Sequence, residues 1–243
     1  MSSNKISPWF YYPQVVTVGE PVQLPDDEAR HLTGSRRMEV GSELTLFDGR
    51  GHIASAAVTS VGSRGRNVVI TATETHIVEP STLNIHLASA LPKGDRLSVM
   101  LDMVTQLGIS SFTPLECERS IVKTSDNALT RWERIMVEAC KQSRRAYLPE
   151  LNTSQKPEQV LTQARGHVWL AHPDGVAAVT LAPVTEGSLT LMIGPEGGFT
   201  DTEVGRLSAR GARVVSLGEG ILRIETAAVS LLACARMVAE AAE

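Results

Sequence analysis

Short alternating runs of apolar and polar residues in the first third of the chain predict β-strands. Leu44–Phe47 is followed by Asp48-Gly49-Arg50-Gly51, which is a strong hairpin signal. His52–Val61 and Asn67–Ile77 alternate or are rich in β-branched residues, and Asp26–Leu32 has the spacing of one short helix. The pattern predicts a small β-barrel over residues 1–77.

After the linker 78–82, runs with strand patterns alternate with runs that have apolar residues at helical spacing. The expected strands are Leu83–Ala88, Ser111–Leu115 and Val168–Ala171, and the expected helices are Asp95–Leu107, Leu129–Gln142 and Thr226–Ala241. This alternation predicts an α/β fold with a parallel sheet over residues 83–243. The last helix consists mainly of alanine, valine and leucine, so we expect it to pack in the core or at a subunit interface.

Two glycine loops each follow an apolar strand near the C-terminus. Leu189–Ile193 leads into Gly194-Pro195-Glu196-Gly197-Gly198, and Val214–Leu217 leads into Gly218-Glu219-Gly220. In a parallel sheet we expect both loops at the carboxyl ends of neighbouring strands, where such sheets bind ligands. Glycines also let the main chain approach a flat ligand closely. The segment therefore predicts a small-molecule site that is built mostly from main chain.

The residues around these loops define a helix and narrow the class of ligand. Thr200 and Glu203 have the spacing of a capping box, and Gly211 is expected to end the helix that they begin. A glycine pair after a strand is also common in simple turns, so a turn without a ligand is the alternative. The fingerprints of dinucleotide and nucleoside triphosphate binding, G-x-G-x-x-G and G-x-x-x-x-G-K-[ST], are absent from the segment. We therefore expect neither a nicotinamide cofactor nor a nucleoside triphosphate.

The glycine segment resembles one enzyme family in particular. IGPEGGF at residues 193–199 and LGEGILRIETA at residues 217–227 are similar to the 16S ribosomal RNA uridine-N3 methyltransferase family, small-subunit methyltransferase E, of the SPOUT class of knotted methyltransferases. Further matching blocks follow in order along most of the chain: His31-Leu32, Phe47-Asp48-Gly49, Leu91–Arg96, Gln106–Gly108, Thr113–Leu115, Glu118–Ser120, Ala139-Cys140, Gln142, Arg145 and Pro149-Glu150. Their order and number make a chance resemblance improbable.

The resemblance implies a fold, a cofactor and an assembly. It implies a SPOUT-type α/β domain over residues 83–243, with a C-terminal trefoil knot formed by the two glycine loops. It also implies a PUA-like RNA-binding β-barrel over residues 1–77. The methyl donor of the family is S-adenosylmethionine, and the family completes each site at the two-fold interface of a homodimer.

The resemblance also assigns residues to the cofactor. The expected S-adenosylmethionine contacts are Leu170, Gly194, Pro195, Glu196, Gly197, Gly198, Leu217, Gly218, Ile221 and Leu222. Leucine and isoleucine side chains can enclose a flat base, while main-chain groups of the loops pair with its edges. Leu170 is the residue expected to line the adenine pocket.

Two charged residues after the second loop are candidates for the chemistry. The acceptor of the family is N3 of a uracil, which must lose its proton before it attacks the methyl group. Arg223 is expected to stabilise the resulting negative charge, because its planar fork suits carbonyl oxygens beside a charged nitrogen. The alternative for Arg223 is a structural pair with Glu225. Glu225 is in turn a candidate base, or a residue that only favours the dipole at the start of a helix.

The charge distribution gives a mixed indication about RNA. The net charge of −4 opposes binding to phosphates, but basic residues cluster locally. The RNA-binding candidates are Arg30, Arg36, Arg37, Arg119, Arg144 and Arg145. Those in the barrel would give register on the RNA backbone rather than sequence readout. Ordinary solvated arginines are the alternative.

Composition places the chain among ordinary globular proteins. Its 243 residues are 42% hydrophobic and 21% charged, without an apolar run long enough to span a bilayer and without a secretory signal. The odd number of widely spaced cysteines, Cys117, Cys140 and Cys234, argues for reduced thiols. The six histidines lack the spacing of metal ligands. We therefore expect a cytoplasmic protein that binds neither a membrane nor a metal.

Three places in the chain depart from the family pattern and leave alternatives open. Glu219 and Gly220 stand where arginine and often proline are usual, Lys141 replaces a glutamate, and Gln106 replaces the glutamate of T-E-L-G. The leading hypothesis is a methyltransferase that acts on a uridine N3 of 16S rRNA within the small ribosomal subunit. The alternatives are a ribosome-binding or assembly protein with weak or no catalysis, and a methyltransferase retargeted to another RNA.

Overall fold

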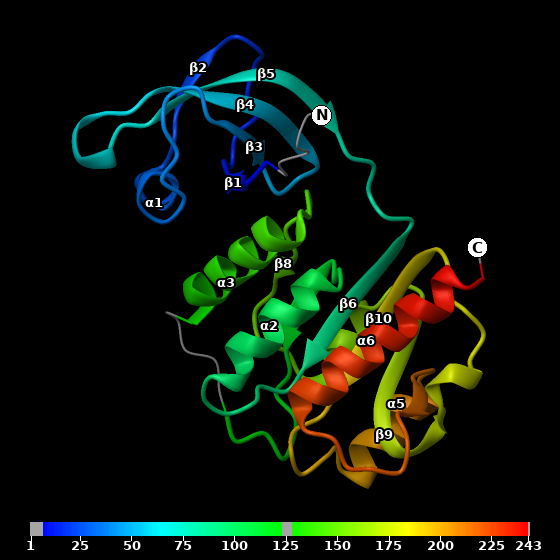
Figure 1. Cartoon of the computed structure of the whole chain (residues 1–243). Coiled ribbons are helices and arrows are strands. Elements are labelled where there is room, and N and C mark those ends of the chain that lie inside the picture. The colour runs from blue at the N-terminus through cyan, green and yellow to red at the C-terminus, as the bar shows by residue number, and fades with distance from the viewer. Residues whose placement is uncertain (1–6, 123–127, 243) are drawn as a thin grey trace. The chain divides into compact units, whose positions relative to one another are not determined.

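The computed structural model describes residues 7–122 and 128–242. The chain folds into two compact units, which are Met1–Pro80 with Cys140–Leu148, and Ser81–Ala139 with Pro149–Glu243 (Figure 1). We refer to them as the first and the second unit. The expected domain limits, 1–77 and 83–243, stay predictions, and residues 1–6, 123–127 and 243 lie outside the described residues.

The first unit is built on one curled sheet. Its strands are β1 (Trp9–Tyr11), β2 (Pro21–Gln23), β3 (Glu43–Phe47), β4 (His52–Ser60) and β5 (Val69–Ile77), in the order β1-β3-β4-β5-β2. β3 and β4 form the hairpin that the sequence predicts. β1 and β2 are the two outer strands and do not pair with each other among the described residues, so the small barrel that the sequence predicts has the form of a curled half-barrel.

Short helical segments and a buried apolar cluster complete this half-barrel. The segments are α1 (Asp26–Arg30), η1 (His31–Ser35) and η2 (Ser63–Gly65). The cluster takes every second residue of β4, at Ala54, Ala56 and Val58, because successive strand residues point to opposite faces. Leu32 from η1 and Phe10 from β1 close the same cluster.

Residues 140–148 belong to the first unit although they come much later in the chain. The Leu148 N–H donates to the Gly49 carbonyl oxygen (2.9 Å), and the Tyr147 hydroxyl donates to the Val78 carbonyl oxygen (2.9 Å). Tyr147 also lies directly against Gly51, which has a φ of +101° and no space for a side chain. The β3–β4 turn is therefore held by a distant segment, which local sequence patterns do not predict.

The second unit contains a six-stranded sheet. Its strands are β6 (Leu83–Ser89), β7 (Ser111–Pro114), β8 (Glu150–Leu151), β9 (His167–Ala177), β10 (Gly187–Ile193) and β11 (Arg213–Ser216), in the order β11-β9-β10-β6-β7-β8. Every neighbouring pair is parallel. The α/β class that the sequence predicts is therefore confirmed.

Helices cover both faces of this sheet. They are α2 (Arg96–Gln106), α3 (Ala128–Ser143), α4 (Pro157–Gln163), α5 (Asp201–Ala209) and α6 (Ile224–Glu240), with the short η3 (Ala178–Thr180). α2 and α6 lie side by side across one face (Figure 1). On the other face, Val160 of α4 and Leu207 of α5 pack with Leu170 and Met192 of the sheet. Apolar residues of strands and of helices thus pack together in one cluster on this face.

One expectation about the order of strands is wrong. The strands before the two glycine loops, β10 and β11, are not neighbours, because β9 lies between them and pairs with both. All three run parallel, so both loops still leave the same edge of the sheet. Sequence patterns also missed β1, β2, β8 and α4, which are too short for their periodicity to show.

Two structural absences apply to the described ranges 7–122 and 128–242. No helix there is both long and apolar enough to cross a membrane. No three His, Cys, Asp or Glu side chains gather there in a way that could hold a metal ion.

Candidate functional site

A cleft of about 420 Å³ opens at the carboxyl edge of the parallel sheet in the second unit. Its walls are the loop Gly194–Gly198 after β10, the loop Leu217–Leu222 after β11, and residues 171–174 of β9. This volume lies within the range that encloses a small-molecule ligand. Parallel α/β sheets bind ligands at this edge, so the cleft is the candidate functional site.

The third wall comes from an irregularity in β9. Val214 and Val215 are consecutive in β11, yet they pair with Leu170 and Val176 of β9. The residues between these two are therefore looped out of the register and reach the cleft. Gly175 is the last residue of this looped-out segment, and a Cβ on it would lie only 2.4 Å from the Val215 main chain. Only glycine permits this approach of two backbones.

The first glycine loop is shaped by the residue that follows it. Phe199 is buried in the core cluster, and a Cβ on Gly194 would lie 2.9 Å from its ring. Gly198 has a φ of +68°, which favours glycine, and its N–H donates to the Pro195 carbonyl oxygen (2.8 Å). The loop is therefore a tight turn wrapped over a buried aromatic side chain.

Arg119 reaches this loop from another part of the chain. Its Nη1 donates to the Gly197 carbonyl oxygen (2.6 Å), and its side chain lines the cleft. The sequence placed Arg119 among the RNA-binding candidates, whereas the structure gives it a contact with the glycine loop.

The second glycine loop presents apolar side chains at the cleft. Ser216 holds the start of the loop, since its hydroxyl bonds both the N–H and the carbonyl oxygen of Gly218. Ile221 is 89% exposed and Leu222 is 38% exposed, and both line the cleft. Two adjacent large apolar side chains in an open cleft provide a surface that a flat apolar ligand would cover.

Most of the expected cofactor contacts converge on this cleft. The lining includes Gly194, Pro195, Glu196, Gly197, Gly198, Leu217, Gly218, Ile221 and Leu222. Leu170 is the exception: it is fully buried with Met192 in the core beneath the cleft, because its side chain points to the face that α4 and α5 cover. Glu219 and Gly220 are the loop residues that depart from the family pattern. Gly220 lines the cleft and Glu219 does not.

The two candidate catalytic residues differ in their surroundings. Arg223 is exposed at the N-terminus of α6, between Leu222 and Ile224, which both line the cleft. Glu225 is buried, does not line the cleft, and pairs with Arg96 at 3.7 Å. The alternative of an Arg223–Glu225 pair is thus replaced by an Arg96–Glu225 pair. Of the two, Arg223 is therefore the residue whose immediate neighbours on both sides reach the cleft.

The remaining RNA-binding candidates gather in the first unit. Arg30, Arg36, Arg37 and Arg144 are exposed there, and Arg145 is half-buried. Lys141 Nζ pairs with Glu28 Oε1 at 2.9 Å in the interior, which ties the segment that carries Arg144 and Arg145 to α1. The unusual Lys141 thus joins two basic clusters that are far apart in the sequence.

The buried cysteines are poor nucleophiles. Burial, together with the Glu203 and Glu158 carboxylates, raises the pKa of the Cys117 thiol to about 12. Burial raises the pKa of Cys140 to about 11. The raised pKa values keep both thiols protonated near neutral pH, which disfavours thiolate catalysis by these two residues.

A larger hollow of about 710 Å³ lies over the sheet elsewhere in the second unit. It includes the amino-terminal ends of β6 and β10, at Asn84 and Ser188. It lacks the glycine loops, and it does not lie at the carboxyl edge. The glycine cleft therefore fits a cofactor better.

Comparison with known proteins identifies the family. Sequence profiles of the RNA methyltransferase domain and of the RNA methyltransferase PUA domain match residues 79–236 and 24–70. Ribosomal RNA small subunit methyltransferase E from Synechocystis sp. is 32% identical over 87% of the chain and 71% of the relative. The protein of that name from Mycobacterium tuberculosis is 30% identical over 92% and 88%. The chain belongs to this family.

A solved structure extends the similarity to the whole fold. Ribosomal RNA small subunit methyltransferase E from Neisseria gonorrhoeae, crystallised with bound S-adenosylmethionine, is 29% identical and has a TM-score of 0.87. The match covers 96% of the chain and 98% of that protein. The family and the SPOUT-type fold with a PUA domain, expected from the motifs, are confirmed. The trefoil knot stays a prediction.

Proposed function

We propose that the chain is an S-adenosylmethionine-dependent methyltransferase that acts on N3 of a uridine in 16S rRNA. The observation that carries this proposal is the cleft between the two glycine loops at the carboxyl edge of the sheet. Its volume, its glycines without side chains and its exposed Ile221 and Leu222 fit an adenosine with a short aliphatic tail. The Neisseria relative, which binds this cofactor, supports the assignment.

The proposed reaction needs positioning and charge stabilisation. S-adenosylmethionine supplies a methyl group on a positively charged sulfur. The uracil N3 loses its proton to solvent water and forms the new N–CH₃ bond as the S–CH₃ bond breaks, which leaves S-adenosylhomocysteine. The cleft would hold the donor in line with N3, and the Arg223 guanidinium would stabilise the charge spread over the two uracil carbonyls.

The first unit would hold the RNA at a distance from the methylated base. Its exposed arginines fit phosphate contacts, which give register on the RNA. Arg37 and Arg144 adopt φ values of +50° and +57°, where non-glycine residues are rare. Arginine at two such positions supports a role for the side chains, because glycine would relieve the backbone strain.

The test is mass mapping of 16S rRNA from a strain that lacks the gene. We expect one uridine to lose one methyl group, and incubation of those small subunits with the purified protein and S-adenosylmethionine to restore it. Unchanged 16S rRNA overturns the proposal. A methyl group missing from another RNA indicates the retargeted enzyme. Altered subunit assembly with all methyl groups present indicates the assembly protein. The proposal places the enzyme in the cytoplasm with its substrate.

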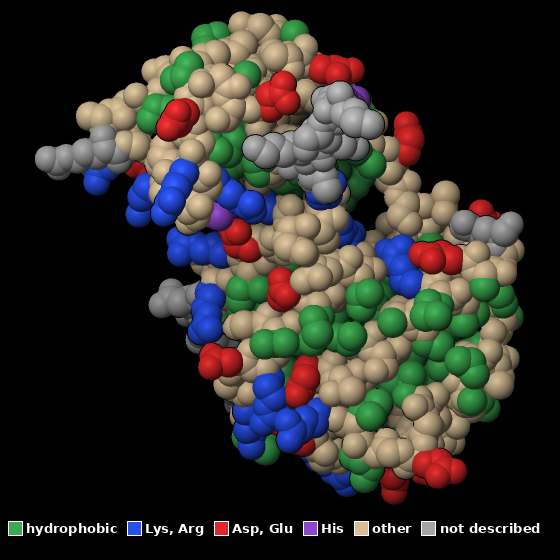
Figure 2. Space-filling model, in the orientation of Figure 1, with side chains coloured by type: hydrophobic (Ala, Val, Ile, Leu, Met, Phe, Trp, Pro, Cys, Tyr) green, Lys and Arg blue, Asp and Glu red, His purple; other side chains and the backbone are tan. Residues whose placement is uncertain are grey.

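We further propose that the protein is a homodimer formed through α6 and its neighbours. Met237 is 70% exposed, as is Val179 of η3, and Val99 of α2 is 52% exposed. Figure 2 shows hydrophobic side chains gathered over this face of the second unit. Exposed apolar side chains that gather on one face of a protein mark interaction surfaces.

Light scattering at micromolar concentration is expected to give the mass of a dimer. Met237→Lys should shift the mass to that of a monomer, since a charge would be buried in the interface. The matched control is Val40→Lys, at a valine of the first unit that is also well exposed (63%), and it should leave the dimer intact. A monomeric parent protein contradicts the proposal.

A further inference from the structure

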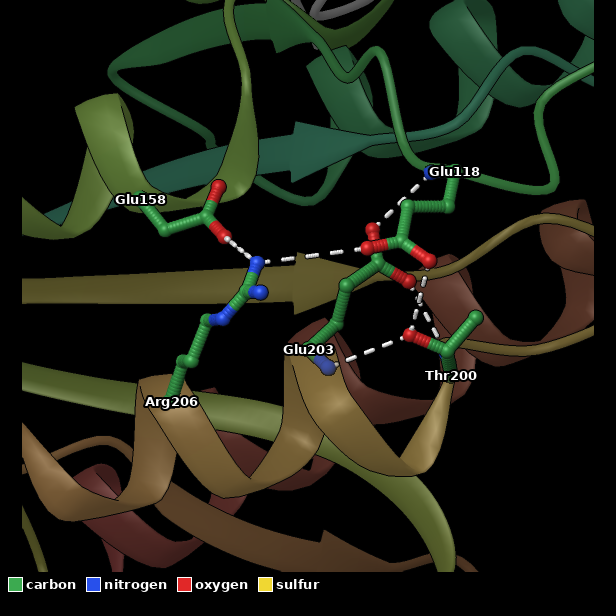
Figure 3. A network of polar contacts seen from close by, with 5 residues as sticks. All are labelled: Glu118, Glu158, Thr200, Glu203 and Arg206. Atoms are coloured by element: carbon green, nitrogen blue, oxygen red, sulfur yellow. Dashed lines mark hydrogen bonds and ion pairs between the residues drawn. The ribbon is translucent and has the colours of Figure 1, made fainter.

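A buried carboxylate lies beside the glycine cleft and has no part in the chemistry described so far. Glu203 of α5 is only 2% exposed and belongs to a polar cluster with Glu118, Glu158, Thr200 and Arg206 (Figure 3). Burying a carboxylate is costly unless hydrogen bonds compensate for the lost water. The bonds that Glu203 makes therefore indicate what it stabilises.

Glu203 accepts hydrogen bonds from two separate backbone segments. Its Oε2 accepts from the Thr200 N–H (2.8 Å), which together with the bond from the Glu203 N–H to Thr200 Oγ1 (3.1 Å) forms the predicted capping box. Its Oε1 accepts from the Glu118 N–H (2.9 Å), in a loop far away in the sequence. The capping box is confirmed, but one of the two carboxylate oxygens serves a different purpose.

The second bond orients the turn that carries Arg119. The Ser120 N–H donates to the Cys117 carbonyl oxygen (3.0 Å), so Glu118 and Arg119 are the central residues of a β-turn. Arg119 extends from this turn to the Gly197 carbonyl oxygen (2.6 Å). The glycine loop is therefore held twice: at Thr200, directly after it, and at Gly197, within it.

We propose that Glu203 is a positioning residue that locks the Cys117–Ser120 turn and the first glycine loop into one frame, so that Arg119 keeps the cleft in its binding shape. This role rests on the proposed function, in which that cleft binds S-adenosylmethionine. Glu203 does not line the cleft and acts only through Arg119 and the loop.

A carboxylate suits this role because it offers two acceptors to two N–H groups. Glutamine would keep one acceptor and turn an NH₂ group toward the other N–H, leaving a buried donor unpaired. The ion pairs in the outer part of the cluster are weaker. Arg206 lies 4.0 Å from Glu118 and 3.7 Å from Glu158, and water screens these charges because Arg206 and Glu118 are exposed and Glu158 is only half-buried. The frame therefore depends on Glu203 and not on the surface ion pairs.

The experiment measures S-adenosylmethionine affinity by calorimetry and thermal unfolding of the same full-length variants. Glu203→Gln and Arg119→Ala should each raise Kd about tenfold, the equivalent of one hydrogen bond to a charged group. The double variant should bind no more weakly than either single variant, because both substitutions disrupt the same contact between Arg119 and the glycine loop.

Two control variants separate positioning from stability. Val160→Ala removes two methyl groups from the core beneath α4 and lies in neither the Cys117–Ser120 turn nor the cleft, so it should lower the melting temperature while Kd stays unchanged. Glu158→Gln removes a surface ion pair and should change neither quantity. Equal Kd values for Glu203→Gln and the parent overturn the positioning role alone. A loss of affinity in Val160→Ala that parallels the fall in its melting temperature also overturns that role, because general stability would then explain the change in Kd. A parent protein that binds no S-adenosylmethionine overturns the proposed function together with this role.

Discussion

Replacing Gly197 with valine is expected to abolish S-adenosylmethionine binding while the protein still folds. A Cβ at this position would lie 3.2 Å from Cδ of Arg119, and the two further methyl groups of valine would extend into the cleft or displace the arginine. The φ of Gly197 is not positive, so the backbone itself accepts a side chain. We expect Kd to rise at least about a hundredfold, or ~3 kcal/mol.

Calorimetry measures this loss, and circular dichroism with thermal unfolding checks the fold. The matched control is Gly205→Val in α5, where a Cβ meets nothing within 4 Å and φ is not positive. That variant should bind like the parent. If Gly197→Val also binds like the parent, the cofactor lies elsewhere in the molecule.

Much of the candidate site was predictable because its signals are local. The capping box at Thr200 and Glu203 needs only a spacing of three residues, and it forms as expected. The glycine loops are likewise defined by the strands that precede them. A Pro-Asp-Gly sequence at 173–175 is also a turn signal. It coincides with the segment of β9 that is looped out of register, which strand patterns alone do not predict.

The parts that could not be predicted depend on contacts between distant residues. No spacing rule relates Glu118 to Glu203, Glu28 to Lys141 or Arg96 to Glu225, yet these three pairs determine how loops and helices meet. The insertion of β9 between β10 and β11 is of the same kind, since strand order follows from packing and not from the strands' own sequences. Leu170 was misplaced for the same reason: an apolar strand residue faces the core or the ligand according to which face the helices cover.

Arg223 is expected to be the residue whose loss slows methyl transfer most without weakening cofactor binding. The residues on either side of it line the cleft, while its own side chain is exposed and does not. Arg223→Ala should therefore leave the S-adenosylmethionine Kd unchanged and remove a donor to the uracil carbonyl oxygens. By analogy with the loss of one oxyanion-hole donor, the activation free energy should rise by about 3 kcal/mol, and the rate of methyl transfer should fall about a hundredfold. Lysine should restore little activity, because an ammonium group cannot reproduce the planar fork of the guanidinium.

Single-turnover methylation of purified small subunits measures the rate, and thermal unfolding of the same variants tests the structural alternative. Within residues 7–122 and 128–242, Arg223 has no ion pair that the substitution would break. The melting temperature of Arg223→Ala should therefore equal that of the parent protein. A lowered melting temperature with normal turnover would mean that Arg223 is structural. If Arg223→Ala methylates as fast as the parent, the charge on the uracil must be stabilised by another group, and Glu225→Gln becomes the next variant. Glu225 is paired with Arg96 and does not line the cleft, so Glu225→Gln should mainly lower the melting temperature. If Glu225 were the general base, the same variant would mainly lower the rate of methyl transfer.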